Sequence, residues 1–145
     1  MSIDVTVETT IGRPLEEVAS YVIDPTNEPE WIRGIVESTL ETPGPIGAGS
    51  RVRRVATFMG RRIKYTPEVA ELEPRSHLLM RTDKPFPMTI EYRFSESSSS
   101  TRFQQRLQGG PGGVMGLLDP VMAMMVRRNV RGDMRRLKTI LEARG

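Results

Sequence analysis

The sequence predicts an α+β domain in which a curved antiparallel sheet of about seven strands wraps around a long C-terminal helix, with two short helices after the first strand. Three observations support this prediction. Several segments alternate apolar and polar residues, turn-forming clusters separate them, and the C-terminal segment has apolar residues at helical spacing. The chain has 145 residues, of which 37% are hydrophobic and 27% are charged. This length and composition predict a single domain over residues 1–145, with one core.

The amino-terminal part is expected to form one strand and two short helices. Residues Ile3–Thr9 alternate apolar and polar, which predicts a strand with one buried face. Pro14 is suited to the first position of a helix, and apolar residues recur after it at helical spacing. Asp24 then ends this helix and can cap a second short helical turn over Pro25–Glu30, which leads to the only tryptophan, Trp31.

Six further strands are expected in the middle of the chain, separated by clusters of glycine, proline and serine. They are Ile35–Leu40, Arg51–Phe58, Ile63–Glu71, His77–Thr82, Met88–Phe94 and Thr101–Leu107. The second of these is ambiguous, because an inward face with Val52 and Ala56 would also carry Arg54. Either a β-bulge changes the register or Arg54 enters the interior.

A long helix is expected to run to Glu142 after the glycine-rich segment Gly109–Gly113, which is interpreted as a flexible connector or as a hinge for ligand entry. Pro120 predicts a short first segment or a kink in this helix. The apolar stripe of the helix contains Leu118, Met122, Val126, Val130, Leu137, Ile140 and Leu141, with Met134 at its edge. The opposite face is basic, with Arg127, Arg128, Arg131 and Arg135. We expect this basic face to be solvated, with contact to an acidic partner, RNA or anionic lipid as the alternative.

The composition excludes several kinds of chemistry. The chain has no cysteine and a single histidine, His77, so thiol chemistry is excluded and no metal site or cofactor is expected. His77 falls on the polar side of its strand, where we expect a surface residue. The 21 Lys+Arg and 18 Asp+Glu give a net charge of +3 and are scattered, so a nucleic-acid partner is not expected. Because no apolar run reaches about 18 residues and no signal-peptide pattern opens the chain, we expect a cytoplasmic protein without a membrane span.

Short motifs in a fixed order resemble those of one known superfamily. They are Val5-Thr6-Val7-Glu8, Pro14-x-x-x-Val18, Tyr21-Val22-x-Asp24-Pro25, Glu30-Trp31, Ile46-Gly47-x-Gly49-Ser50-Arg51, Val69-x-Glu71-x-Glu73-Pro74 and Leu137-Lys138-x-x-Leu141-Glu142. Together they span nearly the whole chain and resemble the START-like (SRPBCC) superfamily, in its polyketide cyclase/dehydrase and lipid-transport branch. The resemblance implies a helix-grip fold and a cavity between sheet and C-terminal helix. Such a cavity would hold a small hydrophobic or amphipathic ligand of lipid, polyketide, steroid or quinone type.

The candidate ligand-binding residues are those whose predicted faces converge on this space. They are Trp31, Tyr65, Met80, Tyr92, Phe103, Gln105, Met122, Met125 and Asn129. A solid core with methionine as filler is the alternative, and Trp31 is interpreted as a core residue or as a cavity wall. For Gln105 the alternation places an amide inside, where it needs a polar partner, and we expect this amide to help orient a ligand.

Three functions follow from these expectations. The first is a binding or carrier domain for an apolar ligand. The second is a polyketide cyclase or dehydrase that acts in the same cavity, and the third is an interaction protein with a filled core that uses its basic helix face. Enzyme activity has little support from the residues, because no inward Ser-His-Asp arrangement is recognisable and Asp133 with Arg54 is the nearest acid–base pair. The sequence does not name the ligand or the oligomeric state.

Overall fold

The computed structural model describes residues 3–58, 60–84, 86–109 and 119–144. In these residues, eight strands and four helical segments follow one another. They are β1 (Ile3–Ile11), α1 (Leu15–Ile23), the 3₁₀ turn η1 (Pro25–Asn27), α2 (Glu28–Trp31), β2 (Ile35–Leu40), β3 (Val52–Phe58), β4 (Arg61–Tyr65), β5 (Glu68–Glu73), β6 (His77–Thr82), β7 (Met88–Ser97), β8 (Ser100–Gly109) and α3 (Asp119–Glu142). The predicted order of elements is confirmed.

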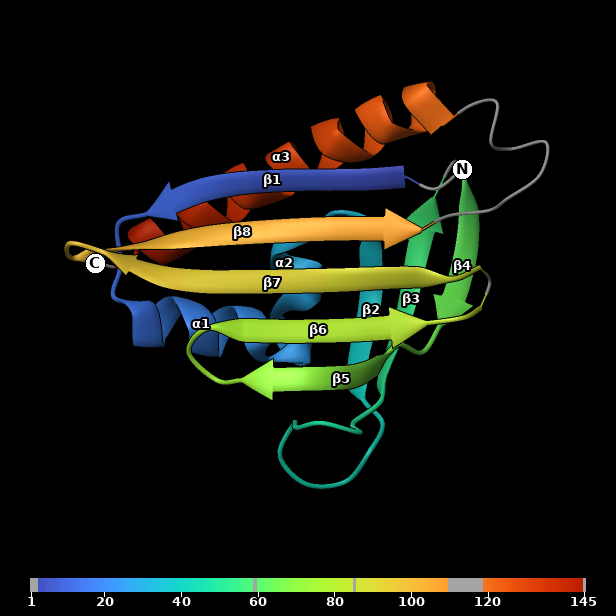
Figure 1. The fold of residues 1–145 in the computed structure, drawn as a ribbon, viewed down its shortest axis with the longest axis horizontal. Helices are drawn as coiled ribbons and strands as arrows, with labels where there is room; N and C mark the ends of the chain where they lie inside the picture. Colours follow the sequence, from blue (N-terminus) through green and yellow to red (C-terminus); the bar gives the residue numbers. More distant parts are fainter. Residues whose placement is uncertain (1–2, 59, 85, 110–118, 145) are drawn as a thin grey trace.

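The strands form two antiparallel sheets that continue into each other. The larger sheet has the order β1-β8-β7-β6-β5, and the smaller one has the order β2-β3-β4. Backbone hydrogen bonds join them, from Val52 N–H to Pro67 C=O at 3.0 Å and from Val69 N–H to Ser50 C=O at 2.8 Å. The result is the expected curved antiparallel surface, with α3 running beside β1 along the larger sheet (Figure 1).

The described part of the chain has eight strands, where about seven were expected. The sequence pattern predicted one strand over Ile63–Glu71, but the structure has β4 and β5 there, separated by Thr66 and Pro67. Proline has no backbone N–H to donate to a sheet ladder and fixes its own φ angle, so the chain leaves one sheet and enters the other at this point.

The core lies between α3, α1 and the concave face of the larger sheet. The apolar stripe of α3 is inward, since Met122, Val130, Leu137 and Leu141 are all buried. Met134, placed at the edge of the stripe, is fully within the core at 2% exposure. The predicted connector Gly109–Gly113 and Leu118 fall mostly outside the described residues, and only Gly109 can be placed.

An aromatic cluster fills one end of this core. Trp31, Tyr92 and Phe103 have ring centroids 5.5–6.1 Å apart, and Phe94 stacks on Phe103 at 5.1 Å. Aromatic rings at such separations in tilted or offset geometry attract each other beyond the effect of burial alone. This cluster therefore holds Tyr92 rigidly from behind, which matters for the site described next.

Candidate functional site

A cavity of about 680 Å³ opens between α3 and the inner faces of both sheets. Ligand pockets in proteins usually have volumes of about 300–1,000 Å³ and mainly apolar walls. The walls are built from β3 and β4 on one side, from β7 and β8 on another, and from α3. Its apolar lining includes Ile63, Met88, Ile90, Leu107, Met122 and Val126. The structure thus has a sizeable cavity rather than the solid core that was the alternative.

Five of the nine candidate ligand-binding residues line the cavity: Tyr65, Tyr92, Gln105, Met122 and Asn129. The other four, Trp31, Met80, Phe103 and Met125, do not. Trp31 and Phe103 are fully buried behind Tyr92 in the aromatic cluster, so Trp31 occupies the core position rather than the wall. Met80 belongs to β6, and among the larger sheet's described strands the cavity reaches chiefly β7 and β8. A ligand contact of these four residues stays a prediction without geometric support.

Arg54 enters the interior, which settles the ambiguity of its strand. Its side chain is 3% exposed and lines the cavity. The register shift in this sheet lies on the partner strand, between Ile35 and Glu37 of β2. The inward face of β3 therefore carries Arg54 together with Ala56, as the unbroken alternation requires.

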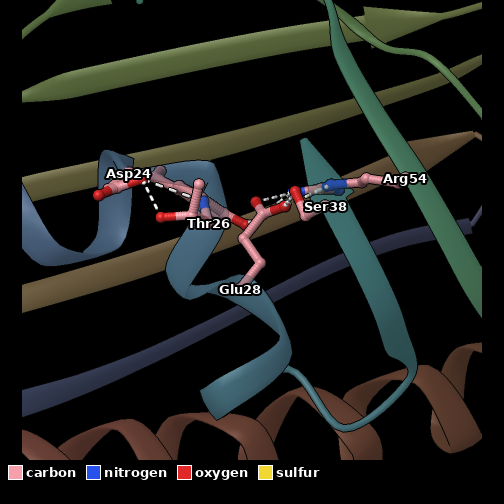
Figure 2. A network of polar contacts seen from close by, with 6 residues as sticks. Asp24, Thr26, Glu28, Ser38 and Arg54 are labelled. Carbon is pink, nitrogen blue, oxygen red and sulfur yellow. Dashed lines mark hydrogen bonds and ion pairs between the residues drawn. The ribbon is translucent and has the colours of Figure 1, made fainter. Parts of the chain in front are cut away.

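The counter-charge of Arg54 is Glu28, which the sequence analysis did not single out. Arg54 Nε donates to Glu28 Oε1 at 3.0 Å, and Arg54 Nη2 donates to Glu28 Oε2. Ser38 of β2 also donates its hydroxyl to Glu28 Oε1. Figure 2 shows the Glu28 side chain reaching from α2 toward Ser38 and Arg54. A two-point pair of this kind fixes the plane of the guanidinium.

The short helices position Glu28 for this contact. The Asp24 carboxylate accepts hydrogen bonds from the backbone N–H of Thr26 at 3.0 Å and from its hydroxyl at 2.7 Å (Figure 2). This cap starts η1, a single 3₁₀ turn that leads directly into α2 and sets the direction of Glu28. Sequence reasoning found the cap but missed its consequence, because 26 residues separate Glu28 from Arg54 and no local pattern links them.

Tyr92 extends the polar group into the cavity. Its hydroxyl oxygen lies 3.5 Å from Arg54 Nη2, and Tyr65 places its ring 6.0 Å from the guanidinium carbon. Burial raises the pKa of Tyr92, although the charge of Arg54 acts in the opposite direction. Burial alone would lower the pKa of Arg54, but Glu28 and the two tyrosines outweigh it and hold that pKa above its ordinary value. The site therefore presents a permanent cation beside a neutral hydroxyl.

Gln105 lies beside Tyr92 on the cavity wall. The two residues are direct partners in the β7–β8 ladder, so their side chains stand next to each other on one face. Gln105 is 5% exposed, and its Oε1 atom accepts no hydrogen bond from any described residue. A buried acceptor without a partner costs free energy, so this oxygen is available to a ligand donor.

Asp133 lines the cavity but does not pair with Arg54, the partner considered for it from the sequence. It accepts from Arg136 Nη2 at 2.6 Å and from the backbone N–H of Arg33 at 3.2 Å. Burial raises the pKa of Asp133, against the lowering effects of these two partners. The acid–base pair considered from the sequence is therefore wrong, because each member is bound to another charge.

His77 lies on the outer face of the larger sheet, away from the cavity. Its Nε2 atom is 2.6 Å from Glu91 Oε2. Burial alone would raise the pKa of the Glu91 carboxyl, but His77 and Arg93 outweigh burial and lower that pKa. In the described part of the chain, no group of three or more acidic or histidine side chains could hold a metal ion. No helix among the described residues is long and apolar enough to span a membrane.

Comparison with known proteins identifies the class of protein that this fold and cavity define. The family model described as polyketide cyclase / dehydrase and lipid transport matches residues 2–142. The chain belongs to this family, so the resemblance seen in the sequence is confirmed. A search of curated proteins finds no match.

Solved structures with the same fold come from several bacteria. TTHA0849 from Thermus thermophilus is 19% identical with a TM-score of 0.82, over 98% of this chain and 99% of that one. The Zhui aromatase/cyclase from Streptomyces sp. R1128 is 15% identical with a TM-score of 0.78, over 99% and 96%. A START superfamily protein from Mycobacterium smegmatis is 17% identical with a TM-score of 0.69, over 97% and 95%. At these identities the likeness establishes the helix-grip fold alone, and family and fold together support a ligand-binding or polyketide cyclase/dehydrase role.

Proposed function

We propose that this chain binds or carries a small amphipathic molecule in the cavity between its sheets and α3. The observation that carries the proposal is the pairing of an apolar cavity of about 680 Å³ with a buried, unpartnered acceptor on its wall, Gln105 Oε1. An apolar body would occupy the space between α3 and β7. A hydroxyl or N–H group on that body would donate to Gln105, and a carbonyl or hydroxyl oxygen would accept from Tyr92 or Arg54.

A polyketide cyclase or dehydrase is the second candidate. Its specific support is the Arg54–Tyr92 contact, since the Tyr92 hydroxyl accepts from Arg54 Nη2 and can donate its own hydrogen to a substrate oxygen on which negative charge develops. Carbon–carbon ring closure also requires a base. Two described carboxylates come into question: Glu28, which is bound to Arg54 and Ser38, and Asp133, which lines the cavity and is bound to Arg136. Binding without turnover therefore has better support than catalysis.

The third expectation, an interaction protein with a filled core, has less support because the core encloses a cavity. The basic helix face is also divided. Arg127 Nη1 and Lys138 Nζ donate to backbone carbonyls of β1 at 3.1 and 2.7 Å, whereas Arg128 and Arg135 line the cavity. A location in the cytoplasm stays an expectation from the sequence.

The test uses matched neutral probes that displace a fluorescent apolar dye, N-phenylnaphthylamine. We expect naphthol to bind about fivefold more tightly than its methyl ether, because one added hydrogen bond contributes about 1 kcal/mol. Gln105→Leu should abolish this preference and leave the protein folded. Gln104→Leu is the matched control, because Gln104 is the adjacent residue of β8 and points to the opposite face.

Two results would count against the proposal. Failure of the dye and both probes to bind would refute the binding function itself. Binding with the same preference in wild type, Gln105→Leu and Gln104→Leu would leave the cavity as the site but remove Gln105 from ligand orientation. Turnover of a bound polyketide-like substrate, measured by mass change, would favour the cyclase.

A further inference from the structure

Among the described residues, five arginines and one acidic residue, Asp133, line the cavity. Two of the arginines are neutralised, because Arg54 pairs with Glu28 and Arg136 pairs with Asp133. The other three, Arg33, Arg128 and Arg135, form no ion pair with any described residue. All three are exposed, so they mark the place where the cavity meets solvent. We call these three residues the arginine rim.

The backbone that carries the arginine rim is fixed on both sides of the opening. Arg128 and Arg135 are two helical turns apart on α3, about 10 Å along its axis, and so lie on the same side of the helix. Arg33 belongs to the α2–β2 connection. This connection is tied to α3 by Asp133, which accepts from the Arg33 backbone N–H at 3.2 Å.

A second contact holds the end of α2, directly before this connection. Arg136 Nε donates to the backbone carbonyl of Trp31 at 3.2 Å, while its Nη2 donates to Asp133 at 2.6 Å. Asp133 and Arg136 thus neutralise each other while bracing the connection. Among the described residues that line the cavity, this leaves the three positive charges of the arginine rim without a counter-charge.

From this arrangement we propose that the ligand is an anionic amphiphile, whose headgroup stays at the arginine rim while its apolar body fills the cavity. This inference rests on the proposed binding function and adds the charge of the ligand to it. Guanidinium groups suit carboxylate and phosphate oxygens, because both can accept two parallel N–H donors. An apolar ligand without charge would leave three cations unused at the opening. A cationic amphiphile would be repelled there.

The experiment compares four ligands with the same chain: decanoic acid, decyl phosphate, decanol and decylamine. Each displaces N-phenylnaphthylamine at neutral pH and low salt. We expect the anion that the rim fits to bind about tenfold more tightly than decanol, since partly exposed charge pairs contribute up to about 1 kcal/mol each. Decylamine should bind more weakly than decanol. The comparison of decanoic acid with decyl phosphate tells whether the headgroup is a carboxylate or a phosphate.

Two double variants that remove the same charge separate the effect of the arginine rim from the effect of net charge. Arg128→Gln/Arg135→Gln should reduce the preference for the anion to less than about threefold, with decanol binding unchanged. The control Arg62→Gln/Arg131→Gln removes the same charge from exposed positions that do not line the cavity, and should keep the preference. Higher salt should weaken the wild-type preference, because the pairs are close to solvent.

Equal binding of decanoic acid, decyl phosphate and decanol would overturn the inference while leaving the proposed function intact. Loss of the preference in both variant pairs would overturn the role of the arginine rim and point to net charge. If no ligand binds but the protein sediments with anionic vesicles through Arg128 and Arg135, the rim is a membrane-contact surface and the inference is wrong. Displacement by none of the four ligands, with no dye bound, refutes the binding function together with the inference.

Discussion

The buried pair of Glu28 and Arg54 allows a demanding test of the structure, because its two members should respond differently to removal. Both side chains are 3% exposed and share two hydrogen bonds. Removing one member of such a pair leaves an uncompensated buried charge, which typically costs about 3–5 kcal/mol. We therefore predict that Glu28→Gln lowers the free energy of unfolding by about 3 kcal/mol or more.

Arg54→Met should cost less, about 2 kcal/mol. A buried carboxyl without a counter-charge can take up a proton and become neutral, and Glu28 keeps the hydroxyl hydrogen bond from Ser38. A guanidinium cannot lose its proton in the same way. The double variant Glu28→Gln/Arg54→Met should be at least about 2 kcal/mol more stable than the sum of the single effects indicates, because it leaves neither charge behind.

Urea unfolding followed by the fluorescence of Trp31 measures these differences. Trp31 is the only tryptophan, is fully buried and packs on Tyr92, so its emission reports the loss of this region. Additive single effects in the double variant would refute the direct pairing of Glu28 with Arg54. So would a cost below about 1 kcal/mol for Glu28→Gln with an unchanged m value.

Three further predictions concern contacts outside the Glu28–Arg54 pair. Gly109→Ala should lower the free energy of unfolding in urea by more than about 2 kcal/mol, because Gly109 has a φ of +117° and an added Cβ would lie 2.1 Å from Pro87 O. The control Gly47→Ala, whose Cβ would meet nothing within 4 Å, should cost under about 0.5 kcal/mol. Glu142→Ala should cost about 1 kcal/mol by the same measurement, since the Glu142 carboxylate accepts the Gly12 N–H at 2.7 Å, and no loss would contradict this tie. Burial raises the pKa of Asp133, so its carboxyl binds a proton more tightly in the native state than in the unfolded chain. The free energy of unfolding should therefore fall as the pH rises from the unfolded-state pKa of 3.8 through the higher native-state pKa. Asp133→Asn should flatten this part of the pH profile, and an unchanged profile would contradict the assignment.

Much of the fold could be predicted from the sequence because period-two alternation and helical spacing report local faces directly. The prediction failed at Pro67, where the apolar pattern continues across a change of sheet. Alternation tells which side chains share a face, but it does not tell where a second sheet takes over. That change depends on the proline and on hydrogen bonds between segments distant in sequence, such as Val52 with Pro67.

The candidate site could be predicted only in part, for a related reason. Tyr92 and Phe94 share one face of β7, and Gln105 and Phe103 share the matching face of β8. The pattern placed all four inward but could not tell which end of the strands faces a cavity and which faces packed core. The phenylalanines lie at the core end, and Tyr92 and Gln105 lie at the cavity end. The path of α3 and the position of the aromatic cluster determine which end of the two strands faces the cavity.

The buried Arg54 could be recognised from the sequence, but its partner Glu28 could not. An arginine inside an apolar alternation was the visible signal that something charged enters the interior. Its partner gave no signal, because Glu28 lies in a short acidic helix that also has the exposed Glu30. A buried charge therefore predicts the existence of a partner but not its position.

Native mass spectrometry of the protein purified from its own host tests the central claim most directly, by comparing the wild type with Ala56→Trp. Ala56 lines the cavity, and tryptophan at this position would occupy much of the space. We predict that the wild type retains one small amphipathic molecule per chain and that Ala56→Trp, folded by circular dichroism, retains none. An unoccupied wild type that also fails to take up amphiphiles, or equal occupancy in the two proteins, would contradict the claim that this cavity is the functional site.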